Sequence, residues 1–318
     1  MSRTRDIIQE IADVRQRRRF GSAMSELPVR LFALEQVFEE YDKSQSELTR
    51  YFPVALIACV EGYFRMAIRD LVDSGDPYLS NAGKSASSLK IDFSILRAVH
   101  GKAITVGELV AHGIPLSRLD FIDCALTNLI GKGFLEALRT TTDRWAYEMQ
   151  GEVPRPILAD SDQVFRDVAR TFELRHIICH EIASAYEIEA EEVARCFQSC
   201  VAFLRTADEF ISETLHPGAP ISQYEMNVAA GESLAETRCR LDEATEEVKQ
   251  HLNTTELAAF NESQSKWEAY SKAWVAFAAG ERSKSGTIWP LIAAEAAEAS
   301  VNRRIDEISG WRRLKNGL

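Results

Sequence analysis

Residues 54–72, VALIACVEGYFRMAIRDLV, form the stretch that most restricts how this chain can fold. The stretch is nearly all apolar, and its charged side chains are Glu61, Arg65, Arg69 and Asp70. The first three follow one another at intervals of four, so they share one face of a helix. A helix that is apolar on its other faces predicts burial on almost every side, which requires several neighbouring helices.

Turn-forming residues are scarce, which favours long helices over short strands. The 318 residues include only 16 glycines and 9 prolines, and no segment shows a strand pattern of more than a few residues. We therefore expect an all-α protein in which a helical bundle is followed by a small three-helix bundle. The expected parts are a first domain at 1–216 with an N-terminal arm at 1–26, a linker at 217–223 that contains part of the HPGAP string, and a second domain at 224–318.

The charge and the cysteines indicate a reduced, cytoplasmic protein. The net charge of −11 argues against a surface coated with positive charge, although the first twenty residues are locally basic. We expect no signal peptide and no membrane span, because charges interrupt the N-terminus and no apolar run approaches about 20 residues. The six cysteines show no C-x-x-C pairing. In an acidic chain the attraction of a nucleic acid depends on a local basic patch, and we expect Arg65 and Arg69 to form one with the N-terminal arginines. These are Arg3, Arg5, Arg15, Arg17, Arg18 and Arg19.

Residues 173–182, ELRHIICHEI, concentrate reactive side chains within one predicted helix, which is expected to begin at a capping residue among 160–162. Three interpretations are open. In the first, Glu173, His176 and His180 share a helical face and bind a transition metal, although the spacing differs from the H-E-x-x-H of metalloproteases. In the second, the two histidines are partly buried structural residues.

The third interpretation pairs Arg175 with His180 for phosphate chemistry. A guanidinium group grips phosphate oxygens in a planar fork, and an imidazole moves a proton near neutral pH. Together they suit RNA cleavage that needs no metal ion or other cofactor. On an ideal helix the two side chains point about 140° apart. They would therefore meet only through a helix bend, the reach of the arginine side chain, or a second copy of the chain.

The string RHIICH resembles the R-x(4–6)-H signature of the HEPN superfamily, whose small all-helical domains occur in ribonucleases of toxin, RNA-processing and antiviral systems. His176 is similar to the polar residue that commonly follows the arginine of that signature. Glu61 is similar to a charged position on the preceding long helix. The resemblance covers roughly Leu27–Leu215, and it implies an insertion at about 73–160 between the paired helices. Within that insertion, residues 73–88 are polar and rich in turn formers, so we expect a loop there.

The resemblance implies a metal-independent endoribonuclease that cleaves RNA by transesterification, and a role as a toxin or phage-defence effector. It also implies a homodimer in which the two motifs line one cleft. The alternative is a catalytically silent module that binds nucleic acid or assembles. The implied catalytic residues are Arg175 and His180, the supporting residues are His176, Glu61 and Glu173, and the RNA-binding candidates are Arg65 and Arg69.

The segment from Leu234 to Trp311 resembles the LprI type of lysozyme-inhibitor domain. Several cysteines would be expected in a secreted family of this type, whereas Cys239 is the one cysteine of this segment. The resemblance implies a domain that senses a ligand or binds a regulatory partner. The matching strings are QSKW at 264–267, WVAF at 274–277, GTIWPL at 286–291 and RIDEI at 304–308.

Aromatic residues recur at three- and four-residue steps in the second of these expected helices. This spacing places them on one face, and such a stripe is typical of the core of a small bundle. We therefore expect the four side chains to be buried, and the alternative is a face that senses a ligand or binds a partner. The four residues are Trp267, Tyr270, Trp274 and Phe277.

Overall fold

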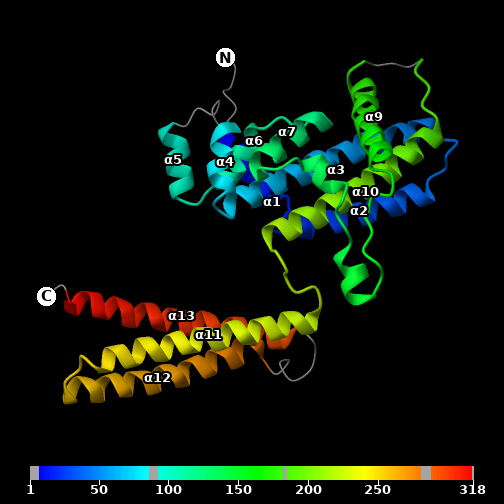
Figure 1. Ribbon diagram of the computed structural model, residues 1–318. Helices are drawn as coiled ribbons and strands as arrows, with labels where there is room; N and C mark the ends of the chain where they lie inside the picture. The colour runs from blue at the N-terminus through cyan, green and yellow to red at the C-terminus, as the bar shows by residue number, and fades with distance from the viewer. Residues whose placement is uncertain (1–6, 86–91, 182–184, 281–287, 317–318) are drawn as a thin grey trace. The chain divides into compact units, whose positions relative to one another are not determined.

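The computed structural model describes residues 7–85, 92–181, 185–280 and 288–316 (Figure 1). These ranges form helices joined by turns and loops, with no strand and one isolated β-bridge between Thr142 and Pro156. The expected all-α fold is confirmed. The chain divides into two compact units, Met1–Pro217 and Gly218–Leu318.

The helices of the first unit are α1 (Ile7–Gln16), α2 (Ala23–Glu40), α3 (Ser46–Asp73), α4 (Tyr78–Ser85), α5 (Phe93–His100), α6 (Val106–Gly113), α7 (Leu119–Ile130), α8 (Phe134–Leu138), a π-helical turn (Trp145–Met149), α9 (Ser161–His180) and α10 (Ala190–Leu215). The helices of the second unit are α11 (Gln223–Lys249), α12 (Thr254–Ala279) and α13 (Trp289–Asn316).

The central helix of the first unit is α3, which packs against α2, α6, α9 and α10. Leu56, Val60, Phe64 and Ile68 are fully buried, so the predicted burial on almost every side is confirmed. By length and composition α3 is also long and apolar enough to cross a membrane. No such helix was expected from the sequence. Inside the first unit, 67% of its most apolar 18-residue window is buried, as in the core helix of a globular domain.

The segment between α3 and α9 contributes to the same core. Ile122, Leu126, Phe134 and Leu138 are buried in one cluster with the residues of α3.

The expectation of a loop at 73–88 is wrong over α4, while 86–88 lie outside the described residues. This helix forms because Asp76 accepts hydrogen bonds from the backbone N–H and the hydroxyl of Ser80, and because Ala82 is buried.

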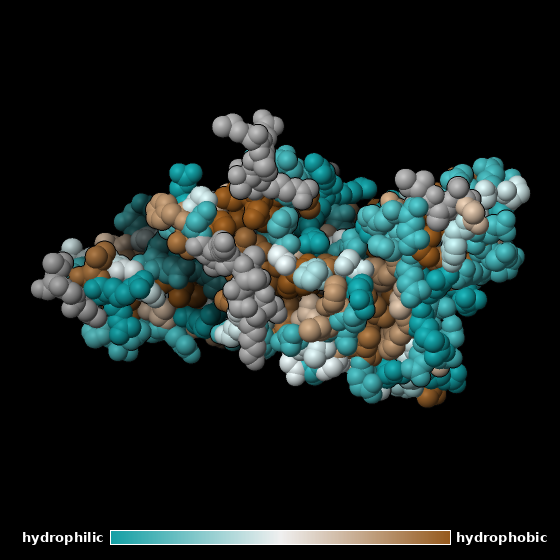
Figure 2. All heavy atoms as spheres, turned by 90° about the horizontal axis from the view of Figure 1, so that it is seen from above, coloured by the Kyte–Doolittle hydropathy of each residue, from teal (hydrophilic) through white to brown (hydrophobic). Residues whose placement is uncertain are grey.

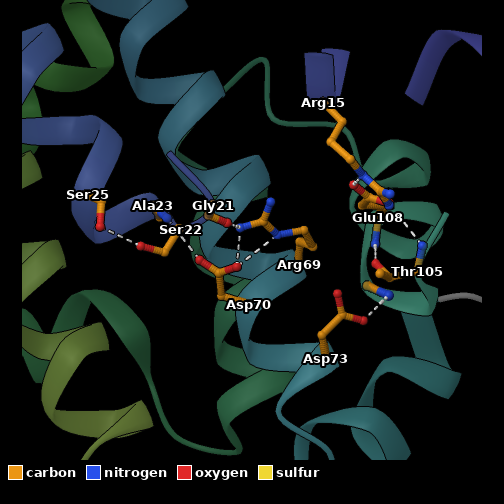
Figure 3. Close-up of polar contacts among 11 residues, drawn as sticks. Arg15, Gly21, Ser22, Ala23, Ser25, Arg69, Asp70, Asp73, Thr105 and Glu108 are labelled. Atoms are coloured by element: carbon orange, nitrogen blue, oxygen red, sulfur yellow. Dashed lines mark hydrogen bonds and ion pairs between the residues drawn. The ribbon is translucent and has the colours of Figure 1, made fainter. Parts of the chain in front are cut away.

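Polar contacts fasten α2 and α6 to the C-terminal half of α3, and α1 to α6 (Figure 3). Asp70 accepts a hydrogen bond from the backbone N–H of Ala23 at 2.9 Å, so a side chain of α3 satisfies the first turn of α2. Asp73 accepts from the backbone N–H of Gly107 at 2.8 Å at the start of α6. Arg15 of α1 forms an ion pair with Glu108 of α6, with 2.9 Å between Nε and Oε1.

Two aspartates fix the first half of α9, the helix that carries the RHIICH motif: one caps its N-terminus and the other binds α10. Asp160 accepts a hydrogen bond from the N–H of Gln163 at 2.9 Å, which confirms the predicted N-terminal cap of α9. Asp167, almost completely buried, accepts from the hydroxyl of Ser199 and from Nε of Arg195 on α10. Burial would raise the pKa of Asp167, but hydrogen bonds from Gln163, Ser199 and Arg195 outweigh it and lower that pKa.

A second buried carboxyl group makes stability depend on pH. The hydroxyl of Tyr63 donates to Oδ1 of Asp208 at 3.1 Å, and burial raises the pKa of Asp208 to about 6. The folded chain therefore binds a proton at this group more tightly than the unfolded chain, whose aspartates have pKa values near about 4. The contribution of Asp208 to stability is fully present below about pH 4 and is lost as the pH rises through about 6.

We expect Asp208→Asn to raise the melting temperature at pH 8 and to leave it nearly unchanged at pH 4. The amide still accepts the Tyr63 hydrogen bond and carries no charge, so the gain at pH 8 is up to about 3 kcal/mol. Thermal unfolding of both proteins from pH 4 to pH 8 at constant ionic strength measures it. A difference in melting temperature that stays the same at every pH would contradict the role assigned to Asp208.

The second unit is a bundle in which α13 packs along both α11 and α12 (Figure 1). Its core is formed by Leu241 and Val248 of α11 and by Val301 and Ile308 of α13, and Trp267 packs against this cluster.

The expected burial of the α12 aromatic stripe is wrong beyond Trp267. Tyr270, Trp274 and Phe277 are 55%, 37% and 77% exposed. Because α12 runs antiparallel to α11 and α13, its C-terminal half lies opposite their N-terminal halves. The large buried side chains of those two helices come later, at 241–248 and 301–308. The second half of α12 therefore presents aromatic side chains to solvent. Figure 2 shows one face of the molecule, on which hydrophilic and apolar patches alternate.

Candidate functional site

The C-terminal end of α9 brings Arg175 and His180 into contact. Nη1 of Arg175 lies 3.2 Å from Nε2 of His180. Arg175 is half-buried at its base, and His180, the last residue of the helix, is exposed. The contact forms within one chain, so a second copy is not needed to bring these two side chains together.

Side-chain direction explains how residues five apart can meet. Side chains on an α-helix lean toward its N-terminus, so the His180 ring lies back over the preceding turn. Its ring centroid is 5.1 Å from that of His176. The long Arg175 side chain covers the remaining angle. Of the three routes considered for this contact, the reach of the arginine is the one that the structure shows.

The contact places a donor opposite a ring nitrogen. A guanidinium group can only donate hydrogen bonds, so Nε2 of His180 is the atom placed to accept one from Arg175. Among the described residues, no carboxylate forms an ion pair with Arg175. The site therefore combines an uncompensated positive charge with a basic nitrogen, which suits the binding of an anion that carries a removable proton.

Glu173, one turn before, belongs to a different arrangement. Its carboxylate accepts a hydrogen bond from Arg170 at 3.0 Å, and Arg170 also binds Glu192 and the hydroxyl of Tyr186. The hydrogen bond that Arg170 donates to Glu192, and then the one that it donates to Glu173, raise the pKa of Arg170 against the opposing effect of burial. Glu173 thus neutralises a neighbouring cation and makes no ion pair with Arg175.

The proposed metal grouping of Glu173, His176 and His180 is not formed. Across the described ranges, no three His, Cys, Asp or Glu side chains are placed so that they could share a metal ion. His176 is exposed, although Phe172 one turn before it is buried. The helix end extends past the residues of α3 and α10 that cover its first half, which leaves His176 in solvent.

A groove between α7 and α9 runs alongside the motif. It has a volume of about 870 Å³, and its walls include Arg118 and Asp120 of α7 and Arg175 and His176 of α9. Arg118, which no sequence motif indicates, is paired with Asp120, with 2.9 Å between Nη2 and Oδ2. Asp123 and Glu173 line the same groove, so its positive and negative charges nearly balance.

The other predicted supporting residues lie apart from this groove. Glu61 is half-buried on α3 and acts electrostatically on Arg65, and within the described residues no hydrogen bond joins it to Arg175 or His180. Arg65 donates from Nη1 to the carbonyl oxygens of Ala111 and His112. Arg69 is buried and binds Asp70 and the carbonyl oxygen of Gly21. The structure thus does not bring these three residues to the Arg175–His180 contact.

Some N-terminal arginines do gather with Arg65 and Arg69. Arg18 lines the same small pocket as these two, between α1, α3 and α6, and Arg15 binds Glu108 at its edge. Arg17 and Arg19 are exposed, and Arg3 and Arg5 lie outside the described residues. The hypothesis of a local basic cluster thus holds for Arg18 with Arg65 and Arg69, and the packing of α1 and α6 beside α3 brings the three together.

Comparison with curated proteins and with solved structures finds no match to this chain. A protein-family model, that of the lysozyme inhibitor LprI, matches residues 217–308. The match spans α11, α12 and most of α13, and it includes all four matching strings: QSKW, WVAF, GTIWPL and RIDEI. The first two residues of GTIWPL lie outside the described residues. Residues 217–308 of this chain are therefore an LprI-type domain.

Proposed function

We propose that the first unit is a metal-independent endoribonuclease of the HEPN type that acts in the cytoplasm as a toxin or phage-defence effector. The observation that carries this proposal is the 3.2 Å contact between Nη1 of Arg175 and Nε2 of His180. It places a permanent cation beside a proton-accepting nitrogen at an exposed helix end, which is the combination that RNA transesterification requires. The R-x(4)-H spacing of RHIICH supports the same assignment.

In the proposed reaction, the scissile phosphate draws the Arg175 guanidinium onto its non-bridging oxygens and so frees Nε2 of His180. This nitrogen takes the proton of the 2′-hydroxyl as the 2′-oxygen attacks phosphorus. The 2′-O–P bond forms, the P–O5′ bond breaks, and the 5′-oxygen takes a proton from solvent or from His176. The products are a 2′,3′-cyclic phosphate and a 5′-hydroxyl, and Arg175 stabilises the charge of the transition state.

RNA and a second copy of the chain are the proposed partners of the first unit. Since Arg175 and His180 already meet within one chain, a homodimer would place two such pairs along one RNA and would not be needed to assemble either pair. The LprI-type domain would bind a regulatory partner or ligand through the exposed side chains of Tyr270, Trp274 and Phe277.

The charge of the groove favours a second candidate function. Asp120, Asp123 and Glu173 line the same groove as Arg175, and like charges repel a polyanion that approaches along it. In this alternative the first unit binds or assembles without cleaving, and its histidines are structural.

The test is cleavage of total RNA by the purified full-length chain in excess EDTA. We expect fragments that end in 2′,3′-cyclic phosphate, and we expect no fragments from the Arg175→Ala and His180→Ala variants. The Arg166→Ala variant removes an exposed arginine from the same helix and is expected to cleave normally. Failure of the wild-type chain to cleave, with or without added divalent metal, would favour the silent module. Cleavage that EDTA abolishes and zinc or manganese restores would overturn metal independence.

A further inference from the structure

The arginine pocket between α1, α3 and α6 is separate from the Arg175–His180 contact. Arg18, Arg65 and Arg69 line it. The other lining residues are Ile11, Val14, Ala111, His112 and Glu108, whose carboxylate is paired with Arg15. The pocket volume of about 40 Å³ exceeds the roughly 10–15 Å³ that one water molecule needs, and it leaves no room for a sugar or a base. The pocket therefore matches a single small polar group.

Arg18 differs from the neighbouring arginines, Arg15, Arg65 and Arg69, because its guanidinium group has no hydrogen-bond or ion-pair partner among the described residues. Arg15 is paired with Glu108, Arg65 with two carbonyl oxygens, and Arg69 with Asp70. Within the described residues, the guanidinium group of Arg18 makes no hydrogen bond and no ion pair. It is nevertheless half-buried, and an unpaired charge in that position is unfavourable.

The surroundings of Arg18 favour an added negative charge. Burial lowers the pKa of Arg18, and the positive charge of Arg69 lowers it further. Three carboxylates, those of Glu108, Asp70 and Glu26, oppose this effect without reversing it. The first is already engaged by Arg15 and by the N–H of Thr105, and the second by Arg69 and the N–H of Ala23.

We propose that this pocket binds a tetrahedral oxyanion of the phosphate type, held by Arg18 with unused N–H groups of Arg65 and Arg69. Guanidinium groups bind phosphate oxygens through paired N–H donors, and Arg65 uses only Nη1 for its carbonyl partners. The bound anion connects α1 with α3 and fastens the N-terminal helix to the first unit. The anion is free inorganic phosphate or the terminal phosphate of a nucleotide, and both carry the same chemistry.

Isothermal titration of the full-length Arg175→Ala protein with sodium phosphate tests this, because that background removes the phosphate-binding arginine of the proposed nuclease site. We expect saturable binding at constant ionic strength, at least tenfold weaker after Arg18→Ala, and unchanged after Arg17→Ala, which removes an exposed neighbour. Hydrogen exchange of residues 7–16 should slow when phosphate binds. Titration with uridine 5′-monophosphate distinguishes the two kinds of anion. Affinity equal to that for inorganic phosphate indicates that the site accepts the terminal phosphate of a nucleotide, and no binding indicates that it accepts the free ion.

Absence of saturable phosphate binding, or equal affinity in the Arg18→Ala and Arg17→Ala proteins, would overturn the oxyanion site. Neither measurement depends on RNA cleavage, so the phosphate site and the proposed nuclease activity are tested independently of each other.

Discussion

Replacement of His180 with alanine is expected to slow RNA cleavage by about 10²–10⁴-fold, the range for loss of a positioned general base. Replacement of Arg175 should slow it by about 10²–10³-fold, as for loss of one group that stabilises transition-state charge. The two side chains touch at 3.2 Å and act on one phosphate. The double variant should therefore be little slower than the slower single variant, because residues that act as a unit are not additive.

Single-turnover cleavage of a labelled oligoribonucleotide measures these rates. His216→Ala removes an exposed histidine at the end of α10 and Arg166→Ala an exposed arginine of α9, and both should retain the wild-type rate. If the double variant lost the product of the two single effects, Arg175 and His180 would act independently and the paired mechanism would be wrong.

Gly107→Ala is expected to destabilise the first unit by about 3 kcal/mol, at the upper end of the range for forcing extra atoms into a packed site. A methyl group at this position would overlap the carbonyl oxygen of Arg69 and would lie 2.7 Å from Cγ of Asp73. Both belong to the buried helix α3, and the carbonyl oxygen cannot move without distorting that helix. The start of α6 would therefore separate from α3 and weaken the hydrogen bond between Asp73 and the N–H of Gly107.

Urea unfolding gives the free energy of unfolding of this variant. The matched control is Gly62→Ala on the exposed face of α3, where a methyl group meets nothing within 4 Å. That change should stabilise the chain by about 0.4–1 kcal/mol, since alanine restricts the unfolded chain more than glycine does. If both variants shifted stability in the same direction, the close approach of α6 to α3 would not be the cause.

Local patterns in the sequence predict a structural feature correctly where neighbouring residues alone determine that feature. The buried helix at 54–72 follows from its apolar composition, and the cap at Asp160 follows from a carboxylate placed before a periodic segment. The position of Arg65 and Arg69 could not be predicted in this way. Both face α1, α2 and α6, away from α9, because of which helices cover each side of α3, and no pattern within one helix contains that information.

Two further differences have the same origin. An ideal helical projection separates Arg175 from His180 because it represents each residue by its direction and ignores side-chain length. For Tyr270 and Phe277, spacing showed that they share a face with Trp267, but it could not show whether large side chains of α11 and α13 lie opposite each of them.

Because Arg175 and His180 both lie in the last two turns of α9, their contact exists only while that helix end is wound. The final turn is closed by the backbone bond from the N–H of Glu181 to the carbonyl oxygen of Ile177. Terminal turns of helices fray at small free-energy cost. The fraction of molecules in which Arg175 and His180 are in contact is then set by a local helix–coil equilibrium. Any ligand or substitution that stabilises or destabilises this one turn changes that fraction.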